Sequence, residues 1–438
     1  MTSDSLVTTP GQLGGTTGEI PFVARAEGAR VYDEQGRDYI DGSSGPVCVN
    51  LGHGVPEVLA AMRAQSELVT FAHRSQFRSR RTAELTAEVL AVAGPGYREA
   101  VYVNSGSEAT ETALRLAFHH HAQRGETDRT VVLTQFPSYH GMTAGALAAS
   151  GHPGRRQGLA PLHDHSAATV PVRSADPDRI LPNVAEWEEA FDRIGSGRIA
   201  AALVEPVGGA STGAVTTPTA VFRRLRELCD AGGALLVVDE VLASFGRTGY
   251  WFGHSPTGVR ADLVAVGKGL SSGYTAIGAC LTGESVLPGR SCADFAFGHT
   301  MSGNPLSAAT ALAVLRYTRE RDLPARARLV GATLRDMLTR SVEPYPFLRR
   351  PRGRGMLWGL PVVQGADEFA AAPLNRAICA AARRHGLVLY PAGVDHRTQA
   401  VLVAPPLTIT ETELDLLVRR LNEMLRDVAA ADDVTRST

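Results

Sequence analysis

The sequence predicts an α/β protein in which a large domain, built on a mostly parallel sheet between helices, is accompanied by a smaller α+β domain. From about residue 80, helical patterns alternate with short runs that are apolar throughout, and strands of this kind are buried on both faces. After about Glu320 the composition shifts to charged helices around short strands. A chain of 438 residues with 44% hydrophobic content can form two such cores.

The first 75 residues contain an irregular segment, a hairpin and a helix. Thr, Gly and Ser without periodicity predict a mobile arm at the start of the chain. Alternating residues at 29–32 and 37–40 predict a β-hairpin, and Pro56 is placed for the first turn of a helix. We expect the hairpin to join the smaller domain. The expected division is an arm at 1–20, a first part of the small domain at 21–75, the large domain at 76–320, and the rest of the small domain at 321–438.

The elements of the two domains follow from their periodicity. A helical run at 83–90 precedes the strands of the large domain. Five apolar strands are expected there, at 100–103, 131–133, 200–204, 234–238 and 263–266. The smaller domain is expected to contain a strand at 386–390 and three amphipathic helices, at 325–338, 374–384 and 411–426.

Composition favours small-molecule partners. The net charge is −1, with acids and bases mixed along the chain, which predicts neither a nucleic-acid-binding surface nor a polybasic membrane surface. The five cysteines form no CxxC pair, as expected for reduced thiols in the cytoplasm. We expect no signal peptide and no membrane span, because no uninterrupted apolar stretch approaches the roughly 20 residues that a span requires.

Lys268 is the only lysine of the chain, since the 44 basic residues are otherwise 43 arginines. It lies between two glycines after the predicted strand at 263–266. A lysine amine can form a Schiff base with an aldehyde or carry a proton, whereas a guanidinium remains protonated. The alternative is that one lysine persists by chance in an arginine-rich chain. A phosphate-binding P-loop is excluded, because Asp262 and Gly269 stand where that motif requires glycine and Ser or Thr.

Other polar residues follow neighbouring strands. Glu205 and Asp239 each come at the end of an apolar run. Each carboxylate could pair with a cationic ring nitrogen, bind a metal or cap a turn. Gly106 and Ser107 follow a strand and open a helix, where backbone N–H groups and the helix dipole favour a phosphate. Ser107 as an ordinary N-cap is the simpler interpretation of that turn.

Pyridoxal phosphate requires this combination of groups. Its aldehyde needs a lysine, its phosphate suits a helix N-terminus, and its pyridine nitrogen needs an anion if the ring is to accept electrons. Tyr139, after another predicted strand, can supply an aromatic ring for stacking. The four strand ends are therefore expected to form one site.

Six segments in order resemble signatures of the class III pyridoxal-phosphate-dependent aminotransferases of fold type I. They are NSGSEATETALRLA, FPSYHGMT, LVEPVGG, LLVVDEVLASFGRTG, VAVGKGLSSGY and GHTMSGNPLSAA. The resemblance runs from about Phe22 to Leu407, and the 29-residue separation of Asp239 and Lys268 fits the family. It implies a seven-stranded sheet in the large domain and pyridoxal 5'-phosphate as the cofactor.

The resemblance also implies a role for each matching residue. Lys268 and Asp239 would be catalytic, the first bonded to the cofactor and moving the proton, the second paired with the pyridine nitrogen. Gly106 and Ser107 would hold the phosphate. Tyr139 would stack above the ring, Val241 would lie under it, and Glu205 would sit near its phenolic side. His140 would also belong to the cofactor-binding residues. Thr300 would reach the phosphate bound in the neighbouring subunit, so a homodimer with shared active sites is implied.

One departure from the family bears on the substrate. Relatives that bind an α-carboxylate often have arginine where Leu402 stands, and Arg397 in the preceding loop could replace it. The alternative, which is the simpler interpretation, is that Arg397 is a solvated loop residue. We therefore expect a cytoplasmic aminotransferase that moves an amino group from an amine or ω-amino acid to a keto acid, pyruvate or 2-oxoglutarate, by a ping-pong mechanism.

Two other hypotheses stay open. The same residues also serve racemases, aminomutases and lyases on this scaffold, and a binding protein without turnover is a further possibility. No metal is expected: consecutive histidines at 119–121 face different sides of a helix, and His163-Asp164-His165 lacks a third ligand at a recognisable spacing.

Overall fold

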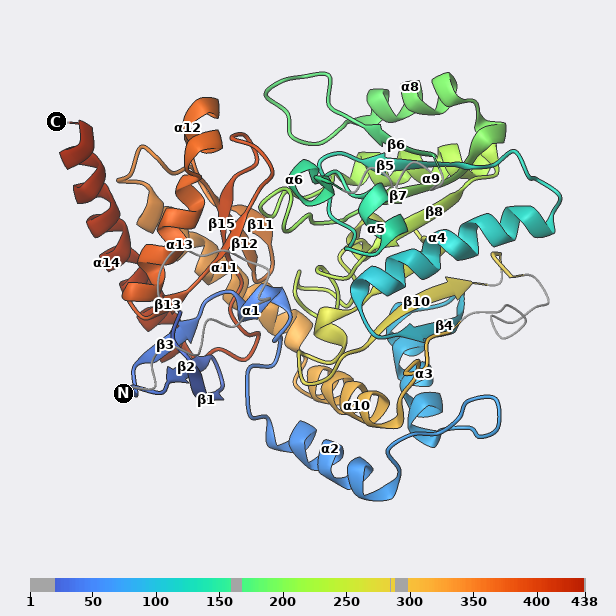
Figure 1. Cartoon of the computed structure of the whole chain (residues 1–438), viewed down its shortest axis with the longest axis horizontal. Helices are drawn as coiled ribbons and strands as arrows, with labels where there is room; N and C mark the ends of the chain where they lie inside the picture. The colour runs from blue at the N-terminus through green and yellow to red at the C-terminus, as the bar shows by residue number, and fades with distance from the viewer. Residues whose placement is uncertain (1–19, 159–167, 284, 288–297, 437–438) are drawn as a thin grey trace.

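The computed structural model describes residues 20–158, 168–283, 285–287 and 298–436, with side chains described up to residue 430. The arm predicted at 1–20 therefore lies, except for Ile20, outside the described residues. Figure 1 shows one half of the molecule built around a large sheet and another half that contains α11 to α14. None of the helices that the structure describes combines the length and apolar character that a bilayer crossing requires.

The large sheet has seven strands, and four of its six pairings are parallel. β10 runs antiparallel to both of its neighbours. The predicted mostly parallel, seven-stranded sheet is thus confirmed. In spatial order the strands are β4 (Tyr97–Val103), β10 (Gly278–Gly283), β9 (Leu263–Val266), β8 (Leu235–Asp239), β7 (Ile199–Val204), β5 (Val131–Gln135) and β6 (Ala168–Val172).

Helices cover both faces of this sheet, because successive strand residues point to opposite sides. In β7, Ala202 and Val204 belong to one hydrophobic core cluster, whereas Ala201 and Leu203 belong to another. The first cluster includes residues of α3, α8 and α9, and the second includes residues of α4. Helices and short helical turns in this half are α2 (Pro56–Leu68), α3 (Arg80–Ala93), α4 (Gly106–Gln123), α5 (Ala144–Ala149), α6 (Pro153–Arg156), α8 (Val184–Ile194), α9 (Thr219–Gly232), α10 (Pro305–Glu320), η1 (Ser196–Arg198), η2 (Ser255–Thr257) and η3 (Lys268–Leu270).

Two four-stranded sheets form the other half. The first pairs N-terminal strands with a strand from the C-terminal part of the chain, β13, which runs parallel to β3. The second contains only C-terminal strands. The elements are β1 (Val23–Glu27), β2 (Arg30–Asp33), β3 (Asp38–Asp41), β13 (Leu387–Val388), β11 (Arg352–Arg354), β12 (Leu357–Pro361), β15 (Ala400–Val403), β14 (Tyr390–Ala392), α1 (Ser44–Val47), α11 (Leu323–Val342), α12 (Ala366–Ala371), α13 (Leu374–Arg384) and α14 (Glu411–Arg436).

Several sequence-based assignments need correction. β6 and β10 were not expected, since one contains a proline and the other begins and ends with glycine, which weakens a strand pattern. The single strand expected at 386–390 is two short strands, β13 and β14, which join different sheets. The hairpin expected at 29–40 is present as β2 and β3, and β1 adds a third strand to it.

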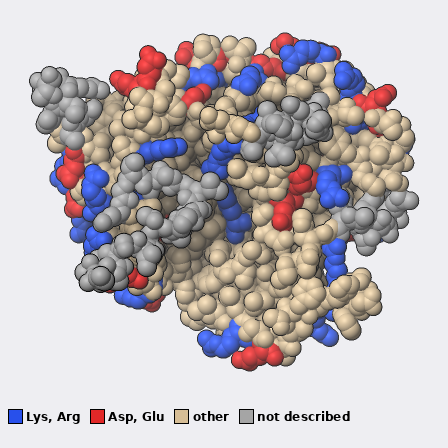
Figure 2. Space-filling model, viewed as in Figure 1, with Lys and Arg blue, Asp and Glu red and all other residues tan. Residues whose placement is uncertain are grey.

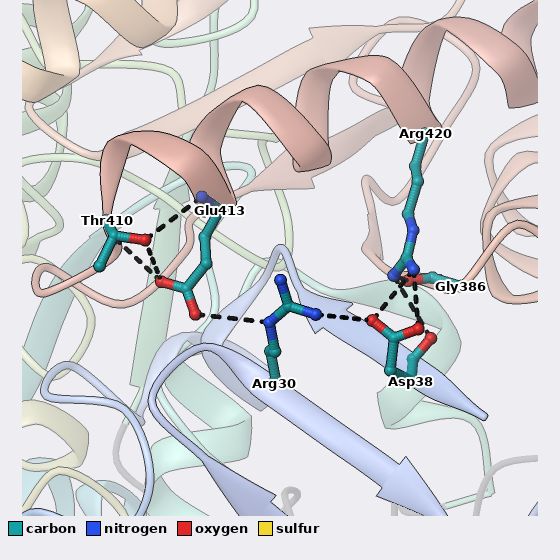
Figure 3. A network of polar contacts seen from close by, with 6 residues as sticks. All are labelled: Arg30, Asp38, Gly386, Thr410, Glu413 and Arg420. Atoms are coloured by element: carbon teal, nitrogen blue, oxygen red, sulfur yellow. Dashed lines mark hydrogen bonds and ion pairs between the residues drawn. The ribbon is translucent and has the colours of Figure 1, made fainter. Parts of the chain in front are cut away.

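A polar network ties the N-terminal strands to α14 (Figure 3). Asp38 accepts two hydrogen bonds from Arg420 Nη2, at 2.9 and 3.0 Å, and Arg30 Nη1 donates to it at 3.0 Å. Arg30 also lies 3.8 Å from Glu413, and Arg420 donates to the carbonyl of Gly386 at 2.8 Å. Residues nearly 400 positions apart in sequence are therefore joined through arginine, whose several donors can serve a carboxylate and a carbonyl at the same time.

Arg247 connects the two halves from the inside and is fully buried. Its Nη1 donates to the carbonyls of Met356, at 3.0 Å, and Pro405, at 2.6 Å. Its Nη2 donates to Ser44 Oγ at 3.1 Å and to Asn50 Oδ1 at 2.9 Å. Burial lowers the pKa of this guanidinium. Four hydrogen bonds to three separate parts of the chain offset the cost of burying its charge.

Replacement of this buried arginine should destabilise the fold strongly. Arg247→Met removes the donor to four buried acceptors, and each unsatisfied acceptor costs about 1–3 kcal/mol, so we expect a loss of at least about 3 kcal/mol in the free energy of unfolding of the apoprotein. Urea unfolding measures this loss. The control is Arg335→Met, which alters an exposed arginine paired only with its neighbour Asp336 and should change stability by about 0.5 kcal/mol or less. Equal effects of the two variants would contradict this account of Arg247.

Candidate active site

The carboxyl ends of the central strands gather the predicted site residues at one edge of the sheet. β7, β8 and β9 are parallel neighbours. Glu205 directly follows β7, Asp239 ends β8, and Lys268 lies two residues after β9. Because β10 is antiparallel to both β9 and β4, β4 runs in the direction of β9. The N-terminus of α4, which follows β4, therefore lies at the same edge.

Lys268 occupies a tightly packed turn. Its φ of 42° is in the left-handed region, which costs a non-glycine residue free energy and marks a conformation held by its surroundings. Gly269 cannot be replaced easily, because a Cβ there would lie 2.3 Å from Asn50 Nδ2. Loss of solvation lowers the pKa of the Lys268 amine, while the charges of Asp239, Cys48 and Glu205 act in the opposite direction. A larger share of the amine is therefore neutral than at an exposed lysine.

Asp239 is held by two hydrogen bonds. His140 Nδ1 lies 2.8 Å from one carboxylate oxygen, and the backbone N–H of Val241 donates to the other at 3.0 Å. The second ring nitrogen of His140 is buried without a hydrogen-bond partner among the described residues. These contacts fix the direction of the carboxylate, which can accept a further hydrogen bond from a bound molecule.

Glu205 lies beside this pair and accepts a hydrogen bond from the backbone N–H of Tyr139 at 3.1 Å. Burial raises the pKa of Glu205 to about 7; the nearby His140 lowers it and the Asp239 carboxylate raises it further. Below that pH the Glu205 side chain is mostly protonated and can donate a hydrogen bond. Glu205 can therefore act as a hydrogen-bond donor in this site below about pH 7.

The N-terminus of α4 forms another wall, and here one sequence-based alternative is wrong. The N-cap is Ser105, whose Oγ accepts from the N–H of Glu108 at 3.2 Å. Ser107 lies in the first turn instead, and its Oγ accepts from the N–H of Met142 at 3.1 Å. Gly106 packs against the side chain of Val241, so closely that a Cβ would lie 2.5 Å from Val241 Cγ1.

Two of the predicted residues lie apart from this cluster. Thr300 is exposed, between His299 and Met301, which are also exposed. Arg397 is exposed and pairs with Asp395 at 3.0 Å, and it donates to the carbonyl of Pro177 at 3.1 Å. Leu402, on β15, is fully buried in an apolar cluster.

Two residues near the site were not identified from sequence. The Arg155 guanidinium carbon lies 4.4 Å from the centre of the Tyr139 ring. His152 approaches the same ring edge-on, with centroids 6.2 Å apart, and burial lowers the pKa of His152 to about 4. The adjacent Arg155-Arg156 pair, close in sequence to the FPSYHG segment, was the available signal.

The histidines considered as metal ligands have other partners. His120 Nδ1 lies 2.8 Å from the carbonyl of Val286, and the two ring nitrogens of His121 contact Glu126 and the carbonyl of Ala200. In the part of the chain that the structure describes, no three His, Cys, Asp or Glu side chains are grouped as metal ligands would be. His163-Asp164-His165 lies outside the described residues.

The described residues fit pyridoxal phosphate. Lys268 supplies the amine, Asp239 an anion oriented by two hydrogen bonds, and the first turn of α4 the N–H groups that lack intrahelical acceptors. Gly106 brings that turn into contact with Val241, which lies next to Asp239. The cofactor's aldehyde, ring nitrogen and phosphate thus each have a matching group at one sheet edge.

Known proteins match this chain over most of its length. The family model described as aminotransferase class-III matches residues 16–425. The uncharacterized aminotransferase YodT of Bacillus subtilis (strain 168) is 35% identical over 424 residues, which cover 93% of this chain and 95% of YodT.

Two solved structures share the fold. An (S)-enantioselective omega-transaminase from Thermomicrobium roseum has a TM-score of 0.83 and 31% identity, with 93% of each chain covered. An amine transaminase from an uncultivated Pseudomonas species, solved in its PLP-bound form, has a TM-score of 0.83 and 29% identity, with 94% of this chain and 96% of that chain covered.

These matches confirm the family resemblance and the fold of type I pyridoxal-phosphate enzymes. They agree with the chemistry of the site, in which a single lysine, an oriented carboxylate and a helix N-terminus meet. The chain therefore belongs to the class III aminotransferase family and is an enzyme that depends on pyridoxal phosphate.

Proposed function

We propose that this enzyme transfers an amino group from an amine or ω-amino acid to a keto acid such as pyruvate or 2-oxoglutarate, in a ping-pong cycle. The observation that carries the choice of donor is Leu402. This side chain is fully buried on β15 and cannot bind the α-carboxylate of an α-amino acid. The names of the two solved relatives, an omega-transaminase and an amine transaminase, support the same donor class.

Each residue of the site has a proposed task. When bound, pyridoxal phosphate supplies an aldehyde that takes up amino groups and a ring that accepts electrons. Lys268 attaches the cofactor and, when its amine is free and neutral, removes a proton from the substrate carbon and returns it. Asp239 keeps a proton on the ring nitrogen. His140 orients Asp239, and Glu205 would contact the phenolic side of the ring.

Packing and phosphate contacts complete the proposed cofactor site. Val241 and Tyr139 would pack against the ring. Gly106 and Ser107 would bind the phosphate through backbone N–H groups and a hydroxyl. Arg397 is proposed as a movable contact for the keto-acid carboxylate, which requires it to leave Asp395 and the carbonyl of Pro177.

We also propose a homodimer in which Thr300 reaches the phosphate bound by the partner subunit. Thr300 is exposed, and so are Met301 and the nearby apolar side chains of the 68–77 segment, including Leu68, Phe71 and Phe77. A second copy would cover such a surface. The cytoplasm is the proposed location, since Cys48, Cys229, Cys280 and Cys379 are free thiols.

Trapping of the cofactor on Lys268 tests the proposal directly. Borohydride should attach the cofactor irreversibly to one peptide, which contains Lys268, because the chain has no second lysine. Peptide mass spectrometry identifies the site. Lys268→Ala should bind cofactor without covalent attachment and should transfer no amino group from a panel of amines to pyruvate or 2-oxoglutarate. Turnover by a folded Lys268→Ala protein would refute the assignment, as would failure of the wild-type enzyme with every amine.

Asp239→Asn should reduce turnover with little change in fold. The amide cannot hold the proton on the ring nitrogen by charge, and loss of one preorganised electrostatic partner costs on the order of 10² in rate. Single-turnover kinetics with one amine measure the change, and circular dichroism verifies the fold. Asp239→Glu, which keeps the charge but displaces it, should retain more activity. Turnover of Asp239→Asn within about twofold of wild type would contradict the role proposed here.

Glu205 should make the apoprotein less stable as pH rises from about 4.5 to about 7. Its pKa in the folded chain is about 7, above the usual value of 4.5, so the folded state binds the proton more tightly than the unfolded state. Stability is then greatest below the unfolded pKa and declines until the folded pKa is passed. Urea unfolding across this range should show a smaller decline for Glu205→Gln. The control, Glu227→Gln, alters an exposed side chain; if it flattens the profile equally, Glu205 is not the source.

A further inference from the structure

Arginines are concentrated beside the carboxyl ends of β5 and β6, next to the proposed substrate site. Arg155 and Arg156 belong to α6, and Arg173 directly follows β6. β5, β6 and β7 are parallel, so these ends share an edge with Glu205. Figure 2 shows basic side chains within the shadowed hollow between the two halves of the molecule.

Two of these arginines lie on aromatic rings of the loop after β5. The guanidinium carbon of Arg155 is 4.4 Å from the centre of the Tyr139 ring, and that of Arg173 is 3.4 Å from the centre of the Phe136 ring. Stacking of this kind orients a guanidinium and leaves its edge N–H groups available for hydrogen bonds. Arg155 is half-buried, so a ligand that it binds is partly shielded from water.

These arginines have few ion-pair partners among the described residues. Over the described ranges, the only ion pair made by Arg155, Arg156, Arg173 or Arg397 is the one between Arg397 and Asp395. Desolvation lowers the pKa of Arg173, and the charges of Arg156 and Arg397 lower it further. Arg155 also lowers the pKa of Lys268, after the larger effect of burial.

We propose, on the basis of the function proposed above, that the natural acceptor is a dicarboxylic keto acid. Arg155 binds its second carboxylate, which a monocarboxylic keto acid such as pyruvate lacks. Arginine binds a carboxylate through two parallel hydrogen bonds, which fixes its direction as well as its position. A dicarboxylate supplies two such groups, one for Arg155 and one for the movable Arg397. Pyruvate supplies only one.

Unreactive acids test this selectivity without turnover. Glutarate and pentanoate have the same five-carbon length but differ by one carboxylate, and calorimetry measures their binding to the holoenzyme. Wild type should bind glutarate at least about tenfold more tightly than pentanoate. The Arg155→Ala variant should lose about 10- to 100-fold in affinity for glutarate but less than about threefold in affinity for pentanoate. Arg155→Lys should recover part of the loss, because it restores the charge without the planar fork. The ratio of kcat/KM for 2-oxoglutarate to that for pyruvate should be greatest in wild type, smaller in Arg155→Lys and smallest in Arg155→Ala.

Two further measurements show whether Arg155 contacts the acid rather than the cofactor's phosphate, and whether its effect is specific rather than a general effect of positive charge. Titration of the apoprotein with pyridoxal phosphate should give similar affinities for wild type and Arg155→Ala. Arg376→Ala removes an exposed arginine of α13 and should leave glutarate binding unchanged.

The inference is overturned if wild type does not bind glutarate more tightly than pentanoate, or if Arg155→Ala lowers the affinity for both acids equally. It is also overturned if Arg155→Ala lowers the affinity for pyridoxal phosphate by the same factor as that for glutarate. Amine-to-pyruvate transfer without a glutarate preference would leave the proposed function standing and remove this inference. A glutarate preference that depends on Arg155, in a protein that transfers no amino group, would leave a dicarboxylate site at Arg155 but refute both the proposed function and the assignment of an acceptor.

Discussion

The strand directions of the central sheet are the constraint on which the site depends. β7, β8 and β9 end side by side, and β10 begins between the ends of β9 and β4. This arrangement leaves little space: a Cβ at Gly278 would lie 2.5 Å from the carbonyl oxygen of Ser105. Backbone segments can meet at this distance only where glycine removes the side chain. The approach of α4 to the Lys268 turn therefore rests on glycines.

The electrostatic character of the site changes along the same edge. Asp239 and Glu205 follow β8 and β7, and the arginines follow β5 and β6. Glu205, with its pKa raised to about 7 mainly by burial, can remain protonated next to the Asp239 carboxylate, which avoids two buried negative charges side by side. The acidic side suits a cationic ring nitrogen, and the basic side suits a keto acid. One row of strand ends thus offers different chemistry to the cofactor and to the substrate.

Arginines rather than lysines hold the second half of the molecule together and join it to this sheet. Arg247 donates four hydrogen bonds in the interior, and Arg420 joins α14 to Asp38 at the surface of β3. A guanidinium can serve several carbonyls at once because its donors lie in a fixed plane. Lysine has no such geometry. The single lysine of the chain lies instead at the sheet edge, where the proposed function requires an amine and not only a positive charge.

The sequence by itself determined the sheet class, most of its strands and the acidic and basic residues that end them. Buried parallel strands are continuously apolar, so a polar residue such as Asp239 or Lys268 at the end of a run is visible without a structure. Motif resemblance added the family and the cofactor, which the comparisons bear out. The proposed tasks of all the site residues remain predictions, and those of Thr300 and Arg397 depend in addition on a partner subunit and on a side-chain movement.

Tertiary structure alone decided the rest, because the deciding contacts join residues without a local signal. β10 and β6 have weak strand patterns and are stabilised by their neighbours in the sheet. Ser105, not Ser107, caps α4, a difference of geometry between two serines in similar positions. Arg155 contacts a ring 16 positions earlier in sequence, and Arg247 contacts carbonyls more than 100 positions away. Such contacts depend on how loops return to the sheet edge, which residue type and spacing do not encode.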